Sequence, residues 1–254
     1  MASTMTLSQL MTAVRQRADM LPNGYTPNVT DTRYFVTDVE LVSYINLSLY
    51  DLYDQLISAY GANYFVKVPA YSFVTDGTTQ QYTLPTDLYK LLGVDLQLSG
   101  TSGSAQQSLV SIKKFEFGDR NRFAVPNFQS FYGVTNLRYR LNGIYLWLTP
   151  IASAGQTIYL WYVPKMTELA TLSDTSDGIS GWLEYVIVDA AIKCLVKEES
   201  DVSALMAEKE KLLVRIMNLA DSRDIGSPPK VTDATYQDNW YPTGNGSGNG
   251  SGSF

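Results

Sequence analysis

The stretch that decides the fold is residues 181–221, GWLEYVIVDAAIKCLVKEESDVSALMAEKEKLLVRIMNLAD. It predicts two amphipathic helices in tandem, because apolar residues recur at helical spacing on both sides of a polar interruption at residues 198–201. The first apolar stripe comprises Leu183, Val186, Ile187, Ala190, Ala191, Cys194 and Leu195, and the second comprises Val202, Leu205, Met206, Leu212, Leu213, Ile216 and Leu219. Helices joined by so short a corner are expected to pack on each other or on shared neighbours.

Two further helices are predicted near the N-terminus, and each opens with a capping box. Thr6 and Gln9 form the first box, and a short amphipathic helix follows it. Thr37 and Glu40 form the second box, and the helix after it is longer and carries a wide apolar stripe. Residues 25–36 lack a period and are expected to connect the two helices. The long helix is expected to pack against the C-terminal pair.

Between these sets of helices the apolar period changes from 3.6 to two, and β-branched and aromatic residues become frequent. We predict strands over residues 66–74, 81–84, 89–98, 109–117, 134–141, 144–148 and 157–163. Asp76-Gly77 is predicted to be a hairpin turn or one end of a slightly longer loop, and Asn142-Gly143 suits the two positive φ angles of a type I′ turn. A Ser/Gly-rich loop over residues 99–104 separates the third and fourth strands.

The predicted fold class is therefore α+β, with a helical bundle built from N- and C-terminal helices, an all-β insertion and an extended C-terminal arm. We divide the chain into N-terminal helices (residues 1–63), the β-rich insertion (64–164), C-terminal helices that complete the bundle (165–222) and the arm (223–254).

Composition excludes several classes of function. The 254 residues contain no histidine, which rules out His-dependent triads and His metal sites. The single cysteine, Cys194, rules out an internal disulfide, and its place in an apolar stripe predicts a small core residue. A net charge of -6 argues against a general nucleic-acid binder. We expect neither a signal peptide nor a membrane span, because the apolar runs are short.

The sequence offers little for catalysis. It contains no Walker loop, GxGxxG, GxSxG or CxxC pair. The carboxylate pairs worth testing are Glu184 with Asp189, on the polar side of a helix, and Asp174 with Asp177, in a loop that also caps the next helix. Calcium binding by the second pair stays open without an EF-hand pattern. We predict a protein that is not an enzyme, with no catalytic residue, no cofactor and no metal site.

The β insertion gathers aromatic and basic residues. The aromatic residues are Tyr139, Tyr145, Trp147, Tyr159, Trp161 and Tyr162, and the basic ones are Lys113, Lys114, Arg120, Arg122, Arg138 and Arg140. The aromatic set favours packing between strands, sheets or subunits, and the alternative is a carbohydrate-binding or host-contact module. The basic set can meet phosphates, but Glu116 and Asp119 interleave, which favours a solvated surface or an inter-subunit ion-pair zone.

The arm lacks the apolar residues needed for a core and ends in a Gly/Asn/Ser repeat. Tyr236, Trp240 and Tyr241 are spaced along it as anchors for a segment that orders on a partner. The repeat alone would favour a tag-like tail, and the aromatic residues favour docking. Tyr236, Trp240 and Tyr241 are therefore the candidate partner-binding residues.

Several stretches resemble tailed-bacteriophage head-to-tail adaptor (connector) proteins. One is DGISGWLEYVIVDAAIKCL over residues 177–195, continued by KEESDV over residues 197–202. The others are VRQRADM over residues 14–20 and ELVSYIN over residues 40–46. The order of helices, β insertion, helices and trailing arm is also similar, so that the resemblance covers most of residues 6–224.

The resemblance implies a structural virion protein at the neck, the junction of head and tail, that is made in the host cytoplasm. It implies a homo-oligomeric ring, usually a dodecamer, that binds beneath the portal protein and connects it to the tail or nozzle protein. DNA would pass through the central channel during ejection without sequence-specific binding, and no membrane is involved. The C-terminal arm would grip the portal, and Tyr236, Trp240 and Tyr241 stand where that arm would be.

The residues are compatible with such a ring. A closed ring needs a heterologous interface, in which one face of each subunit meets a different face of the next. Wide helical stripes and uncovered strand edges can supply those faces. A ring of acidic copies is also consistent with a channel that lets DNA slide.

Overall fold

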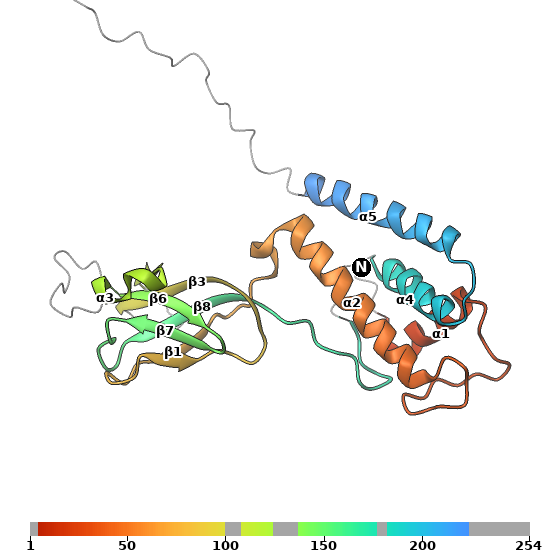
Figure 1. Cartoon of the computed structure of the whole chain (residues 1–254), viewed down its shortest axis with the longest axis horizontal. Helices are drawn as coiled ribbons and strands as arrows, with labels where there is room; N and C mark the ends of the chain where they lie inside the picture. Colours follow the sequence, from red (N-terminus) through yellow and green to blue (C-terminus); the bar gives the residue numbers. More distant parts are fainter. Residues whose placement is uncertain (1–4, 100–107, 124–136, 177–181, 224–254) are drawn as a thin grey trace, which may run out of the picture.

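The computed structural model describes residues 5–99, 108–123, 137–176 and 182–223. They form an elongated molecule with helices at one end and two β-sheets at the other (Figure 1). All strands lie between Tyr71 and Pro164, and the long helices lie before and after them in the chain. The α+β class with a β insertion between two sets of helices is thus confirmed.

The helical end is built from α1 (Leu7–Arg17), α2 (Asp38–Tyr60), α4 (Leu183–Lys197) and α5 (Ser203–Arg223). At the start of α1, the Gln9 backbone N–H donates to the Thr6 hydroxyl, and the Thr6 N–H donates to the Gln9 side chain. Thr37 and Glu40 make the same two bonds at the start of α2. Both predicted capping boxes are confirmed, and they satisfy backbone donors that the first helical turn leaves free.

The helix α4 lies at the centre of this end, in contact with α1, α2 and α5. The sequence predicted that it buries one stripe, but the structure also buries Tyr185, Val188, Asp189 and Ile192. The prediction of a single buried side was wrong because neighbours cover α4 from several directions, and a helix in that position is buried almost all round. The resulting core joins residues of all four helices, such as Leu10, Ile45, Val186 and Ile216.

The other end is a sandwich of two sheets. One sheet has the order β1-β8-β3-β4 and the other β2-β7-β6-β5, and every pairing is antiparallel except that of β5 with β6. The strands are β1 (Tyr71–Val74), β2 (Gln81–Thr83), β3 (Leu88–Ser99), β4 (Ser108–Ser111), β5 (Lys113–Lys114), β6 (Arg138–Asn142), β7 (Tyr145–Thr149) and β8 (Thr157–Pro164). Alternate residues of both sheets, among them Leu96, Leu148 and Leu160, share one apolar core.

The predicted hairpin at Asn142-Gly143 is confirmed, because β6 pairs with β7, and β3 pairs with β4 across the Ser/Gly-rich segment. Of the two alternatives for Asp76-Gly77, the hairpin was wrong, since β1 pairs with β8 while β2 pairs with β7 in the other sheet. The Asp76 carboxylate accepts the backbone N–H groups of Thr78 and Thr79 at 2.9 and 2.7 Å. It therefore shapes a loop that carries the chain from one sheet to the other.

The turn between β6 and β7 differs from its prediction by one residue. Asn142 pairs with Tyr145, so that Gly143 and Ile144 form the two-residue loop. Of these two loop residues, only Gly143 has a positive φ, at 57°. Glycine at the first loop position with an ordinary second residue is the pattern of a type II′ turn, which gives the strands the same favourable twist as the predicted type I′ turn.

Aromatic residues join the two ends of the molecule. The Tyr53 hydroxyl of α2 donates to the Pro164 carbonyl at the end of β8 at 2.8 Å, and its ring lies edge-on to Phe65 and Tyr89. Phe65 belongs to a short 3-10 helix, η1 (Ala62–Phe65), that follows α2. An apolar cavity of about 190 Å³ lies beside these residues, and Lys165 and Ser176 are the polar side chains that line it.

Candidate assembly surfaces

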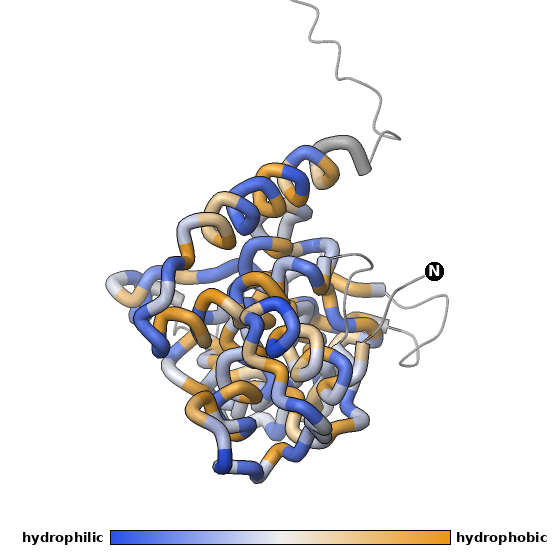
Figure 2. The backbone as a smooth tube through the Cα atoms, turned by 90° about the vertical axis from the view of Figure 1, so that its right-hand side faces the viewer, coloured by the Kyte–Doolittle hydropathy of each residue, from blue (hydrophilic) through white to orange (hydrophobic). Residues whose placement is uncertain are grey.

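The helix α5 lies on the outside of the helical end and leaves much of its own apolar surface uncovered. Ile216 is fully buried and Leu212 nearly so, and they anchor the helix on α2 and α4. Met206, Val214 and Met217 are 49%, 59% and 46% exposed. Figure 2 shows α5 raised above the other helices, with hydrophobic positions around it.

We call Met206, Val214 and Met217 the α5 stripe, because helical spacing puts them on one side of the helix. The sequence predicted that Met206 and Leu219 belong to the buried stripe, which was wrong, since both are exposed. The physical reason is that α5 rests on its neighbours by a narrow edge around Ile216. Exposed apolar side chains gathered on one helix face are typical of a surface for assembly.

A buried ionic network fixes α5 on the bundle. Asp189 of α4 is 4% exposed, and its carboxylate accepts hydrogen bonds from Lys209 of α5 at 2.8 Å and from Lys193. Lys209 also contacts Asp51 of α2 at 3.3 Å, and the Tyr185 hydroxyl donates to Asp51. Burial acts to raise the pKa of Asp189, but its two lysine partners outweigh this and lower it. The carboxylate therefore remains charged and holds three helices together.

This network corrects the prediction for the pair Glu184 and Asp189. Glu184 is exposed as expected, whereas Asp189 points into the bundle. The two carboxylates thus lie on different sides of α4 and do not form an acid–base pair. The sequence signal that could have revealed the network is Lys209, which sits on the apolar side of α5.

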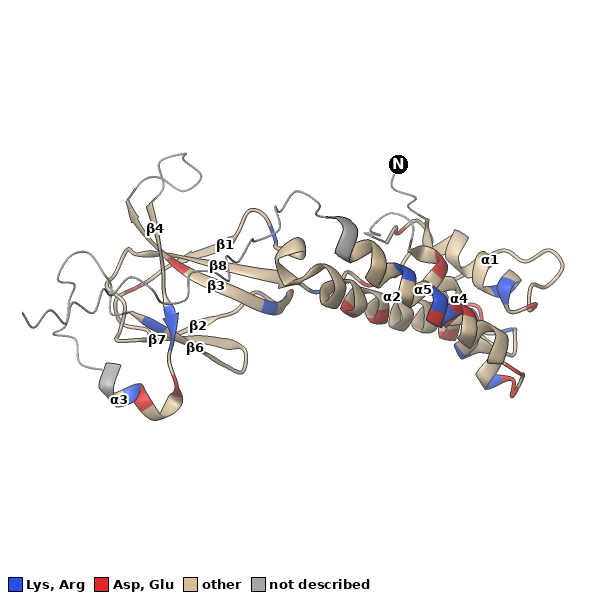
Figure 3. Ribbon diagram, turned by 90° about the horizontal axis from the view of Figure 1, so that it is seen from above, with Lys and Arg blue, Asp and Glu red and all other residues tan. Residues whose placement is uncertain are grey.

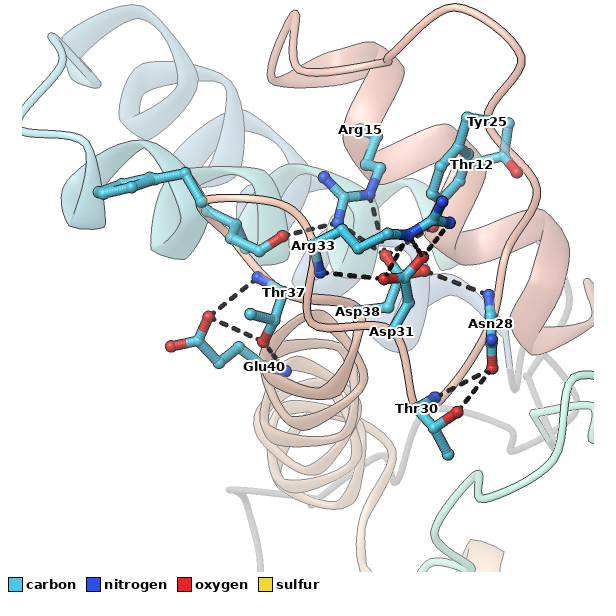
Figure 4. Close-up of polar contacts among 12 residues, drawn as sticks. Thr12, Arg15, Tyr25, Asn28, Thr30, Asp31, Arg33, Thr37, Asp38 and Glu40 are labelled. Carbon is cyan, nitrogen blue, oxygen red and sulfur yellow. Dashed lines mark hydrogen bonds and ion pairs between the residues drawn. The ribbon is translucent and has the colours of Figure 1, made fainter.

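A second network holds residues 25–38 against α1 (Figure 4). Arg15 is buried and donates through Nη2 to Asp38 and to the Val36 carbonyl, both at 2.7 Å. Asp38 also accepts from the Tyr25 hydroxyl at 2.9 Å and from the Asn28 N–H at 3.1 Å. Arg15 Nε and Nη2 and both carboxylate oxygens of Asp38 are used within the chain, so that the network acts structurally.

The structure also shows the surroundings of the other residues that the sequence raised as candidates for catalysis or metal binding. Burial raises the pKa of the Cys194 thiol to about 11, so it stays protonated and unreactive at neutral pH. Asp174 accepts the N–H groups of Ala170 and Thr171 at 2.8 Å, and its predicted partner Asp177 lies outside the described residues. No group of three metal-ligating side chains occurs among the described residues. No helix in the described part of the chain has the length and hydropathy of a membrane span.

The aromatic residues of the insertion lie in different environments. Tyr162 is in the sandwich core, and Tyr159 is buried in the same strand. Trp161 donates its Nε1–H to Asp95 at 2.7 Å on one sheet, while Trp147 packs edge-on against Phe115 and Phe117 on the other. The two tryptophans therefore lie on different sheets, each with its own partners, as expected for aromatic residues that pack within a protein.

The predicted partner-binding residues Tyr236, Trp240 and Tyr241 lie outside the described residues. The described surfaces point to a protein that acts through contacts between molecules. Sequence comparison identifies the class: residues 5–242 match the family model of a phage head-to-tail adaptor protein. The chain belongs to the SU10 adaptor protein family. No curated protein matches the sequence.

The match confirms the resemblance found in the sequence. The protein is a phage adaptor, a component of the virion that contacts other virion components. Both sets of helices and the β insertion fall within the matched residues.

Proposed function

We propose that this adaptor assembles as a closed ring beneath the portal protein, joins the capsid to the tail or nozzle protein, and leaves a central channel for DNA. It catalyses no reaction. The observation that carries the proposal is membership of an adaptor family across residues 5–242. Its function would then depend on how copies of the chain fit together.

Two exposed apolar surfaces support a ring. One is the α5 stripe, and the other is the outer side of α2, where Val39 and Leu47 are exposed. A heterologous interface requires two different surfaces on each copy, and these lie on different helices of the same bundle. In the proposed ring, the α5 stripe of one copy packs against the outer side of α2 in the next.

The arm is the proposed contact with the portal. Residues 224–254 follow α5, and a chain of this length reaches on the order of 100 Å when fully extended. Tyr236, Trp240 and Tyr241 supply large side chains that suit pockets on a partner. The arm can therefore bridge to a portal ring above the helical bundle.

Portal capture by truncated chains tests this proposal. Deletion of residues 224–254 should abolish capture by purified portal and leave the helices folded, because α5 ends at Arg223. The triple substitution Tyr236→Ala, Trp240→Ala and Tyr241→Ala should have the same effect. Pull-down measures capture, circular dichroism measures folding, and negative-stain images show whether rings form on the portal.

Deletion of residues 244–254 alone is the matched control, since it removes only the Gly/Asn/Ser-rich ending and Phe254. Capture should be retained in that variant. If the chain without residues 224–254 binds portal as well as the full chain, the arm does not make the contact. If full-length protein and portal together give no ring, the proposal that the adaptor assembles as a ring is wrong.

A further inference from the structure

Charge is distributed unevenly between the two ends of the molecule. Residues 64–164 contain eight Lys and Arg against five Asp and Glu, whereas residues 1–63 and 165–222 together contain nine against 17. Figure 3 shows Lys and Arg at the β6–β7 end of the sandwich, and mixed, mainly acidic colouring along the helices. The sandwich is therefore a locally basic part of an acidic protein.

Four of these cations form what we call the β5–β6 basic patch: Lys113, Arg120, Arg138 and Arg140. Lys113 lies opposite Arg138 in the parallel β5–β6 pair, and Arg140 follows two residues later on the same face. Arg120 begins α3 (Arg120–Phe123), a short helix after η2 (Phe117–Asp119). Lys113 and Arg120 are exposed, and Arg138 and Arg140 are half-buried.

Phe117 organises the centre of the patch. Its ring is 47% exposed, and the guanidinium carbons of Arg120 and Arg140 lie 4.5 and 5.2 Å from the ring centroid. Arg120 also donates through Nη1 to the Phe117 carbonyl at 3.2 Å, and Trp147 lies edge-on to the ring at 6.1 Å. These contacts fix two guanidinium groups without neutralising either charge.

The patch differs from the helical end in how its cations are paired. Arg15, Arg17, Lys197 and Lys209 each form an ion pair with a carboxylate there. Within the described residues, Lys113, Arg120 and Arg140 have no ion pair, although Glu116 and Asp119 are in the same segment. Several fixed cations without carboxylate partners form a surface suited to an external polyanion.

A second copy of the chain fits this surface poorly. The acidic corner between α4 and α5, with Glu198, Glu199 and Asp201, lies at the opposite end of the long molecule (Figure 3). Pairing that corner with the patch would be a head-to-tail contact along the long axis, whereas the ring proposed above joins copies side by side through α5 and α2. Packing side by side leaves the patch free for another ligand.

We propose that the β5–β6 basic patch binds the phosphate backbone of double-stranded DNA, independently of sequence. Arginine and lysine contacts to phosphates supply salt-dependent affinity without reading bases. The surrounding acidic surface keeps this contact local, so that DNA is touched at the sandwich and repelled elsewhere. The inference goes beyond the adaptor role, and it requires no portal.

Fluorescence anisotropy with a labelled duplex of about 30 base pairs, between about 50 and 200 mM salt, tests the patch in the full chain. Arg120→Gln with Arg140→Gln should weaken binding about tenfold and reduce the slope of log K against log salt by about 1.8, which is about 0.9 for each lost phosphate contact. Lys90→Gln with Lys211→Gln is the matched control, because it removes two exposed cations outside the patch. Binding by this control should equal that of the unchanged protein.

Arg120→Lys with Arg140→Lys separates charge from folding, since it keeps both charges and should keep the salt slope. The proposal is overturned if the unchanged protein does not bind the duplex, or if the patch variant and the control lose affinity equally. It is also overturned if polyglutamate binds the patch in preference to the duplex, because the ligand would then be an acidic protein surface. None of these results affects the portal-capture test.

Discussion

Asp189 shows how a single residue sets the position of a whole helix. It lies at the meeting point of α2, α4 and α5, and Lys193 and Lys209 both donate to it. A buried carboxylate is tolerated there because two cations and the surrounding hydrogen bonds compensate its desolvation. Removing the charge would leave both lysines partly buried and without their main partner.

We expect Asp189→Asn to lower the free energy of unfolding by about 2 kcal/mol at neutral pH, less than for a fully buried pair because both lysines are partly exposed. Since the folded-state pKa of Asp189 is lowered, its contribution is present above the ordinary pKa of about 3.9 and disappears as pH falls through the folded value. The difference between the two proteins should therefore shrink in acid.

Urea unfolding followed by circular dichroism at several pH values measures this difference. Glu184→Gln, at an exposed position on the same helix, is the control and should change little. Equal unfolding midpoints for Asp189→Asn and the unchanged protein at neutral pH would show that the network does not stabilise the bundle.

At the scale of elements, α5 has an inner edge that holds it in place and an outer stripe that remains free. Two neighbouring residues separate these roles, since Ile216 is fully buried and Met217 is 46% exposed. Hydrophobic burial stabilises a fold only where the side chain leaves water, so the two positions should respond differently to substitution.

Ile216→Ala should lower the free energy of unfolding by about 2–5 kcal/mol, the usual cost of truncating a buried aliphatic side chain. Met217→Ser should change it by less than about 0.5 kcal/mol, as is usual at the surface, but should impair ring formation on the portal. Thermal unfolding measures the first effect and negative-stain imaging the second. Normal rings from Met217→Ser would exclude the α5 stripe from the interface.

At the scale of the whole molecule, the helical end and the sandwich have separate apolar cores with no buried residue in common. Among the described residues, the aromatic contacts around Tyr53 and Phe65, together with neighbouring polar contacts such as Tyr89 with Asp54, link them. Each end should therefore respond to loss of its own core and be largely insensitive to loss of the other.

Ile45→Ala in the helical core and Leu148→Ala in the sandwich core test this independence, since both side chains are fully buried. Each substitution should lower the free energy of unfolding of its own end by about 2–5 kcal/mol. Hydrogen exchange followed by mass spectrometry should show faster exchange only in the altered end. Faster exchange at both ends in either variant would mean that the molecule unfolds as one unit.

The sequence by itself determined the class of fold, the starts of α1 and α2, and the adaptor family. Capping boxes at Thr6 and Thr37 act within a few residues, and a change of apolar period from 3.6 to two is visible without tertiary information. The turn at Gly143 was located to within one residue for the same reason. These features depend on local interactions, which neighbouring residues specify.

Only the tertiary structure decided which strands pair, which side of α4 and α5 is covered, and where Asp189 points. β1 and β8 are far apart in the chain, and the loop at Asp76 leads into the other sheet instead of closing a hairpin. Met206 and Asp189 are placed by the number and direction of neighbouring helices, which helical periodicity does not encode. Non-local packing thus determined the two surfaces on which the proposed ring and DNA contacts depend, because burial is a property of the assembled elements.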